Sequence, residues 1–171
     1  MLRNLHFSLL AFFVISFSIG AVAQEDTSFE KMLDTIYSGT VPVIQPQLLF
    51  SELDKNRDFV VLDSREKREY QVSHLKNARW VGYKDFDLGR VRDIPKNARI
   101  VVYCSVGYRS ERIGEKLLHA GYQDVENLYG GIFNWVNGGY PVFDQSAQTD
   151  RVHAYSPVWS IWLKKGTKVF D

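Results

Sequence analysis

The only cysteine of the chain closes an apolar run in the stretch Arg99-Ile-Val-Val-Tyr-Cys104-Ser-Val-Gly-Tyr-Arg109-Ser110. The run Ile100 to Tyr103 is apolar or β-branched, which predicts a buried strand. Downstream, apolar residues recur at helical spacing, which predicts a helix with one buried face and a glycine at its end. These residues are Ile113, Leu117, Ala120 and the closing Gly121. The stretch therefore predicts a strand, a short cysteine loop and a helix.

The cysteine loop has features that favour a reactive thiol. Ser110 is expected to cap the following helix, because its side-chain oxygen can accept a hydrogen bond from an N–H group of the first turn. The loop N–H groups and the helix N-terminus favour an anion beside Cys104, and Arg109 adds a permanent positive charge. Both should favour the thiolate, which is the nucleophilic form. The alternative is that Cys104 only packs, since free cysteine is often buried as a small apolar residue.

Composition is that of an ordinary globular protein. Of the 171 residues, 45% are hydrophobic and 24% are charged, which is enough for one domain with its own core. The formal net charge is +1 without any basic block, so the charge pattern gives nucleic-acid binding no support. The four histidines lack metal-ligand spacing and there is no Gly-rich nucleotide loop, so neither a metal nor another cofactor is expected.

Residues 1–23 are predicted to be a cleavable signal peptide. Arg3 is the only full charge before Glu25, and residues 7–19 are apolar residues and serines. Small residues then precede the expected cut after Ala23. The apolar stretch is short for a membrane span, so we expect cleavage, no membrane attachment afterwards, and a periplasmic or secreted protein. A lone thiol in an oxidising compartment is expected to have a use, although pairing with another chain stays open.

Apolar runs and helical patterns alternate along the rest of the chain. Strands are expected at Phe59–Leu62, Arg79–Gly82 and Asp124–Leu128. Helical segments are expected within Glu25–Ser38, from Pro46 onward, at Glu66–Gln71 and at Ile132–Val136. Because the connections are too short for separate domains, the pattern predicts one α/β unit with a mostly parallel sheet.

Three polar residues near the second strand are expected to support the site rather than to act in it. Asp63 is expected to cap the following helix, and Arg65 to pair with a nearby carboxylate. His74 is expected to satisfy backbone groups near the sheet edge.

The C-terminal segment has a different character. Residues 144–150 are polar and linker-like, and an aromatic and basic tail follows at 151–171. One interpretation, which we favour, is that the aromatic side chains pack back on the domain. The other is an exposed docking patch for a protein partner.

Four motifs resemble those of single-domain rhodaneses, the sulfurtransferase family, and their exported bacterial type in particular. They are Val61-Leu-Asp-Ser-Arg65, Ser73-His74-Leu-Lys-Asn-Ala78, Cys104-Ser-Val-Gly-Tyr-Arg-Ser110, and Tyr129-Gly-Gly131 with Trp135 and Gly139-Tyr-Pro-Val142. The resemblance covers about residues 37–145. It divides the chain into the signal peptide (1–23), an N-terminal helical extension (24–36), the rhodanese-like domain (37–145) and the tail (146–171).

The resemblance implies a parallel five-stranded sheet flanked by helices on both faces, with the cysteine loop at the carboxyl ends of the strands. It also implies chemistry: the Cys104 thiolate takes a sulfur atom from a small anionic donor such as thiosulfate, and the persulfide passes it to cyanide or a thiol. The loop that would cradle this sulfur consists of Ser105, Val106, Gly107, Tyr108, Arg109 and Ser110. Whether Arg109 binds the donor or shapes the loop stays open.

The family also offers alternatives to sulfur transfer. In the phosphatases of this fold the arginine comes six residues after the cysteine, whereas Arg109 comes five after Cys104, as in the sulfurtransferases. Ser105 and Val106 differ from many active relatives, at positions that tune donor preference. The main alternative is a non-catalytic module that holds a partner on the rhodanese scaffold; many fold relatives of that kind lack the cysteine that this chain keeps.

Overall fold

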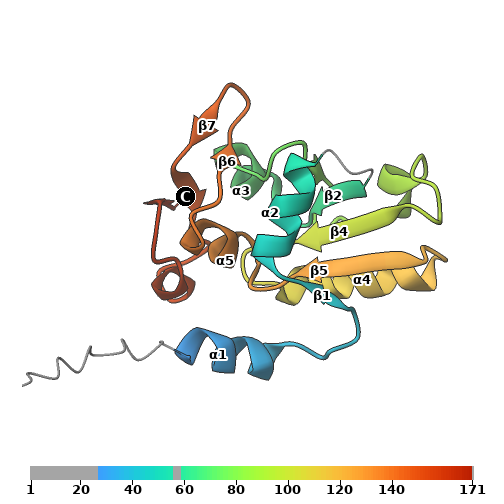
Figure 1. Cartoon of the computed structure of the whole chain (residues 1–171), viewed down its shortest axis with the longest axis horizontal. Coiled ribbons are helices and arrows are strands. Elements are labelled where there is room, and N and C mark those ends of the chain that lie inside the picture. Colours follow the sequence, from blue (N-terminus) through green and yellow to red (C-terminus); the bar gives the residue numbers. More distant parts are fainter. Residues whose placement is uncertain (1–26, 56–58, 171) are drawn as a thin grey trace, which may run out of the picture.

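A computed structural model describes residues 27–55 and 59–170 of the chain (Figure 1). The predicted signal peptide and its cut after Ala23 lie outside these residues. Within them, no helix is long and apolar enough to cross a bilayer. The α-helices are α1 (Ser28–Ile36), α2 (Pro46–Asp54), α3 (Lys67–Val72), α4 (Tyr108–His119) and α5 (Gly131–Asn137). Two 3₁₀ helices are η1 (Leu88–Val91) and η2 (Trp159–Trp162).

A five-stranded parallel sheet forms the centre of the fold, in the order β1-β5-β4-β2-β3. Its strands are β1 (Val43–Ile44), β2 (Phe59–Asp63), β3 (Arg79–Trp80), β4 (Arg99–Tyr103) and β5 (Asp124–Leu128). This is the sheet that the resemblance implied. The third strand is shorter than expected, because the chain leaves the sheet after Trp80.

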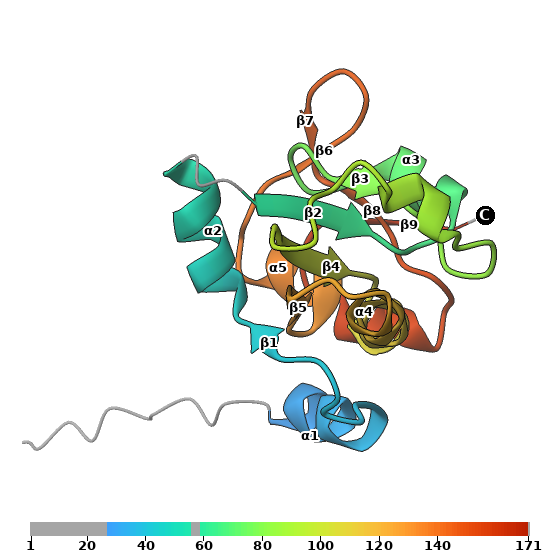
Figure 2. The ribbon, with the colours of Figure 1, turned by 90° about the vertical axis from the view of Figure 1, so that its right-hand side faces the viewer.

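Alternating strand residues build one core on each face of the sheet. Val61, Val101 and Tyr103 belong to a cluster that also holds apolar residues of α1, α2 and α5. Leu62, Ile100 and Val102 belong to the other cluster, which is covered by α4 and η1. Helices therefore flank both faces, as expected, and Figure 2 shows α2 and α4 on opposite sides of the sheet.

The cysteine loop enters its helix earlier than the sequence suggested. Helix α4 begins at Tyr108, and its N-cap is Gly107, not Ser110. Ser110 is fully buried inside the first turn, where its hydroxyl bonds to Gly107 O (3.1 Å) and to Asn127 Oδ1 (2.7 Å). The expected Ser110 cap is therefore wrong, because Gly107 takes a left-handed conformation (φ +102°) that turns the chain directly into the helix.

The segment that was expected to be a linker is a hairpin. Strands β6 (Val142–Phe143) and β7 (Gln148–Thr149) pair antiparallel, and Asp144 Oδ1 accepts hydrogen bonds from the N–H groups of Ser146 (2.8 Å) and Ala147 (2.9 Å) at the turn. The hairpin turns the chain back toward the domain. Strands β8 (Arg151–His153) and β9 (Thr167–Val169) then form a separate parallel pair.

The tail packs on the domain, as the favoured interpretation expected. Val152, Ala154 and Leu163 are fully buried in the core cluster on the α5 face. Other tail side chains remain exposed, among them Val158 and Ile161. A protein partner for residues 151–171 stays a prediction.

Candidate active site

Cys104 lies at the carboxyl end of β4, in the connection to α4. Its side chain is 1% exposed and belongs to the lining of a pocket of about 390 Å³. Ser105, Val106, Tyr108 and Arg109 of the predicted loop line the same pocket. The carboxyl edge of an open parallel sheet is where such folds place their sites.

The carbonyl groups of the loop point away from the pocket, because each is bonded to the surrounding protein. Ile132 N–H donates to Cys104 O (2.9 Å), and Phe133 N–H donates to Ser105 O (3.0 Å). The Tyr37 hydroxyl donates to Val106 O (2.8 Å). Gly107 O accepts from Asn127 Nδ2 (3.0 Å), Ser110 Oγ (3.1 Å) and the Glu111 N–H (3.1 Å). Fixing the carbonyls outward leaves the loop N–H groups for the interior of the loop.

One of these N–H groups bonds to the sulfur atom, and several others are unpaired. Gly107 N–H donates to Cys104 Sγ at 3.1 Å. Among the residues that the structure describes, no acceptor bonds to the N–H groups of Ser105, Val106, Tyr108 or Arg109. Unpaired N–H groups at a loop and a helix start form an anion-binding cradle. The arrangement suits a thiolate or an anion attached to the sulfur.

Two glycines permit this close packing. A Cβ at Gly107 would overlap the Tyr37 hydroxyl, and a Cβ at Gly131 would overlap the backbone of Cys104 and Ser105. Both glycines also have positive φ angles, +102° and +56°, that side chains with a Cβ rarely adopt. The loop thus depends on glycine in two separate segments.

Arg109 is held by a carboxylate that the sequence analysis did not single out. Its Nη1 donates to Glu69 Oε2 (2.7 Å), and its Nη2 donates to Glu69 Oε1 (2.8 Å) and to Ser105 Oγ (2.9 Å). Ser105 Oγ also donates to Glu69 Oε1 (3.1 Å). Glu69 therefore joins α3 to the cysteine loop and neutralises Arg109. The only signal in the sequence was its spacing after Glu66, with which it forms a reciprocal capping box at the start of α3.

The ion pair between Glu69 and Arg109 shifts the pKa of both side chains. Burial alone raises the pKa of Glu69, but the hydrogen bonds and charge of Arg109, with the charge of Arg65, outweigh it and lower that pKa from 4.5 to about 2. For Arg109, burial alone lowers the pKa, but bonding to Glu69 and the charge of the Cys104 thiolate hold it above its usual range. Both groups are charged at neutral pH.

The lowered pKa makes Glu69 a source of acid sensitivity. A carboxyl whose pKa is lower in the folded state stabilises the fold at high pH and loses this contribution as pH falls, here from about 5 to about 2. The shift corresponds to about 3 kcal/mol. Glu69→Gln is expected to lower stability at neutral pH but to flatten its decline over this interval, measured by urea unfolding across pH. The exposed Glu30→Gln should keep the wild-type decline; equal slopes for Glu69→Gln and wild type would contradict the assignment.

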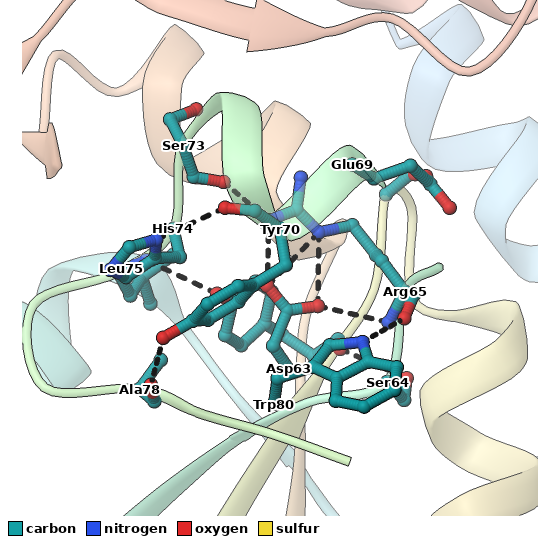
Figure 3. A network of polar contacts seen from close by, with 12 residues as sticks. Asp63, Ser64, Arg65, Glu69, Tyr70, Ser73, His74, Leu75, Ala78 and Trp80 are labelled. Atoms are coloured by element: carbon teal, nitrogen blue, oxygen red, sulfur yellow. Dashed lines mark hydrogen bonds and ion pairs between the residues drawn. The ribbon is translucent and has the colours of Figure 1, made fainter. Parts of the chain in front are cut away.

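Figure 3 shows the polar network that contains the three predicted supporting residues, Asp63, Arg65 and His74. Asp63 and Arg65 are fully buried and form an ion pair, with Arg65 Nη2 2.6 Å from Asp63 Oδ2. Asp63 also accepts the Tyr103 hydroxyl, and Arg65 donates to Ser73 O (2.6 Å). Arg65 therefore pairs with a nearby carboxylate, but Asp63 does not cap α3. Glu66 caps that helix, because Asp63 turns toward the guanidinium.

His74 lies outside the pocket lining. Its backbone forms a two-way bridge with Phe143 (2.8 and 2.9 Å), its Nδ1 lies 3.1 Å from Tyr70 O, and its ring stacks on Tyr70 at 4.1 Å. Asp63 and Arg65 are also absent from the lining. The three residues therefore belong to the structure around the pocket, and none of them faces its interior.

The lining of the pocket also contains residues from several elements that the sequence analysis did not join to the cysteine. They are Ile36, Glu66, Arg68, Tyr83, Lys84, Tyr155 and Trp159. Tyr155 and Trp159 belong to the C-terminal segment, whose aromatic cluster was noted as packing or docking. Only the return of the chain through the β6–β7 hairpin brings them to the site.

Comparison with known proteins assigns the part of the chain that carries this loop to a family. Residues 46–138 match the rhodanese-like domain, which covers more than half of the chain and includes β2, β4 and the cysteine loop. The chain belongs to the rhodanese-like domain family. A solution structure of the rhodanese-like domain of an Anabaena protein is 25% identical, with a TM-score of 0.57 over 60% of this chain and 79% of that one.

Further relatives extend the comparison. The fold is also that of a polysulfide-sulfur transferase homodimer from Wolinella succinogenes, with a TM-score of 0.55 and 22% identity over 71% of this rhodanese-like chain and 90% of that one. Among curated proteins, a tRNA uridine(34) hydroxylase of Streptococcus suis is 31% identical over 118 residues, covering 63% of this chain and 34% of the relative. The chain thus spans about a third of the length of that relative.

Proposed function

We propose that this rhodanese-like protein is a sulfurtransferase that moves a sulfane sulfur from an anionic donor to a thiophilic acceptor through a persulfide on Cys104. One observation carries the proposal: Cys104 lines the pocket, the Gly107 N–H donates to its Sγ, and other N–H groups of the same loop have no acceptor among the described residues. This site offers a nucleophile and an anion cradle at the same place.

The reaction with thiosulfate balances without a further reactant. The Cys104 thiolate attacks the outer sulfur, the bond between the two donor sulfurs breaks, and its electron pair leaves with sulfite. Cyanide then attacks the outer persulfide sulfur, thiocyanate leaves, and the thiolate is restored. The reaction is a double displacement through a covalent intermediate. Preoriented N–H groups that meet charge developing on the transferred sulfur are worth a few kcal/mol.

Arg109 is proposed to shape the loop. Glu69 and Ser105 Oγ accept hydrogen bonds from both Nη atoms of its guanidinium, which ties the side chain to α3 and to the loop. The pair joins α3 to the first turn of α4, next to the cysteine loop.

Kinetics with purified protein test the proposal. Thiocyanate formation from thiosulfate and cyanide is expected to follow a ping-pong pattern, with parallel double-reciprocal lines, because the donor product leaves before the acceptor reacts. Intersecting lines would contradict the covalent intermediate. Absence of turnover with thiosulfate, a thiosulfonate and a polysulfide would overturn sulfur transfer and favour the partner-holding module.

A further inference from the structure

The C-terminal segment beyond the family match supplies one wall of the Cys104 pocket. The rhodanese-like match ends at residue 138, whereas Tyr155 and Trp159 both line the pocket. The wall is therefore an addition to the matched domain.

The segment that carries this wall is firmly attached. Val152, Ala154 and Leu163 are fully buried in the core. Asn137, at the end of α5, donates from Nδ2 to Trp162 O (2.8 Å) and accepts the Lys164 N–H at Oδ1 (2.7 Å). Because anchors lie on both sides of Tyr155 and Trp159, the wall is part of the folded domain.

Tyr155 has an unusual backbone that fixes its ring at the site. Its φ is +64°, a conformation that costs a non-glycine residue free energy and persists only where the surroundings impose it. Its N–H donates to His153 Nδ1 (3.1 Å), and its ring centre lies 4.9 Å from Arg109 Cζ. Trp159 meets the same ring edge to face, at 6.5 Å. The two rings therefore contact each other at the pocket, and the Tyr155 ring also lies against Arg109 of the loop.

The pocket is larger than a compact inorganic donor requires. Thiosulfate has a handful of heavy atoms and fills about 150 Å³ if each takes the ~30 Å³ of a water molecule. The pocket measures about 390 Å³, within the range of sites for organic ligands. Beside the two rings, its apolar and aromatic lining includes Ile36, Tyr83, Val106 and Tyr108.

We propose that Tyr155 and Trp159 make the site selective for sulfur donors whose sulfane sulfur is carried by an organic body the size of an aromatic ring. The inference rests on the proposed sulfur transfer. The anionic sulfur occupies the N–H cradle at Cys104, and the organic body lies against the aromatic wall. With an arylthiosulfonate, the thiolate attacks the outer sulfur, the sulfur–sulfur bond breaks, and the electron pair leaves with the arylsulfinate.

Two thiosulfonates that differ only in their organic body provide the probe. With cyanide as acceptor, kcat/KM for benzenethiosulfonate is expected to exceed that for methanethiosulfonate by about tenfold or more, since a hydrophobic pocket gives at least this factor for added apolar groups. Tyr155→Gly and Trp159→Ala should each reduce this ratio severalfold. Glycine accepts the positive φ of position 155, so the first variant removes the ring without straining the backbone.

Ile161→Ala is the matched control, because Ile161 lies on the same 3₁₀ turn, is exposed and does not line the pocket. It should keep the wild-type ratio. A wild-type ratio near one, or an unchanged ratio in Tyr155→Gly, overturns the selectivity while sulfur transfer stands. Absence of turnover with both donors and with thiosulfate overturns sulfur transfer itself, and the selectivity with it.

Discussion

Cys104→Ser is expected to lower kcat/KM for sulfur transfer by at least about 10³-fold, the scale on which removal of a covalent nucleophile acts. The serine hydroxyl remains protonated and cannot form a persulfide, and no other thiol is available, because the chain contains one cysteine. The measurement is thiocyanate formation at saturating and limiting donor.

Loss of activity must be separated from loss of structure. Sulfur and oxygen differ little in size, so the unfolding free energy of Cys104→Ser should stay within about 1 kcal/mol of wild type. Alkylation of wild-type protein, which can modify only Cys104, should abolish turnover to the same extent. Turnover that survives both treatments would mean that the proposed nucleophile is wrong.

Asp63→Ala is expected to cost about 3–5 kcal/mol of stability, because it leaves the buried guanidinium of Arg65 without its counter-charge. Asp63 accepts three kinds of donor: the Arg65 backbone N–H (2.9 Å), the Arg65 guanidinium, and the Tyr103 hydroxyl. Arg65 Nη1 already has no partner among the residues that the structure describes. Urea unfolding measures the loss.

Two variants sharpen this prediction. Asp93→Ala breaks a pair of similar length, 2.7 Å to Arg79, whose side chains are 41% and 61% exposed, and should cost no more than about 1 kcal/mol. The double variant Asp63→Leu with Arg65→Met removes both charges and should be more stable than Asp63→Ala alone. A cost for Asp63→Ala equal to that of Asp93→Ala would contradict the structural role of the pair.

The central elements were predictable because their signals are local. The apolar run of β4, the helical spacing of Ile113 and Leu117, and the glycine after α4 each depend on neighbours in the sequence. The placement of Cys104 at the end of a buried strand followed from these signals. The parallel sheet followed from the alternation of apolar runs and helical patterns, and the family resemblance added its five strands and the helices on both faces.

The remaining features depend on contacts between distant residues. Glu69 lies 40 positions before Arg109, and nothing in its own helix indicates that it faces the loop. Ser110 looked like a cap because its type suits one, but Gly107 starts the helix and Asn127 holds the hydroxyl inside. Tyr155 reaches the pocket only through a hairpin whose polar residues are typical of a linker.

Mass spectrometry of the protein after reaction with a sulfur donor tests the central claim most directly. Wild-type protein incubated with thiosulfate or a thiosulfonate without acceptor should gain the mass of one sulfur atom on the peptide that contains Cys104. Cyanide should then remove that mass and yield one thiocyanate per persulfide. An unmodified Cys104 after every donor, with the thiol shown free by subsequent alkylation, would contradict the account.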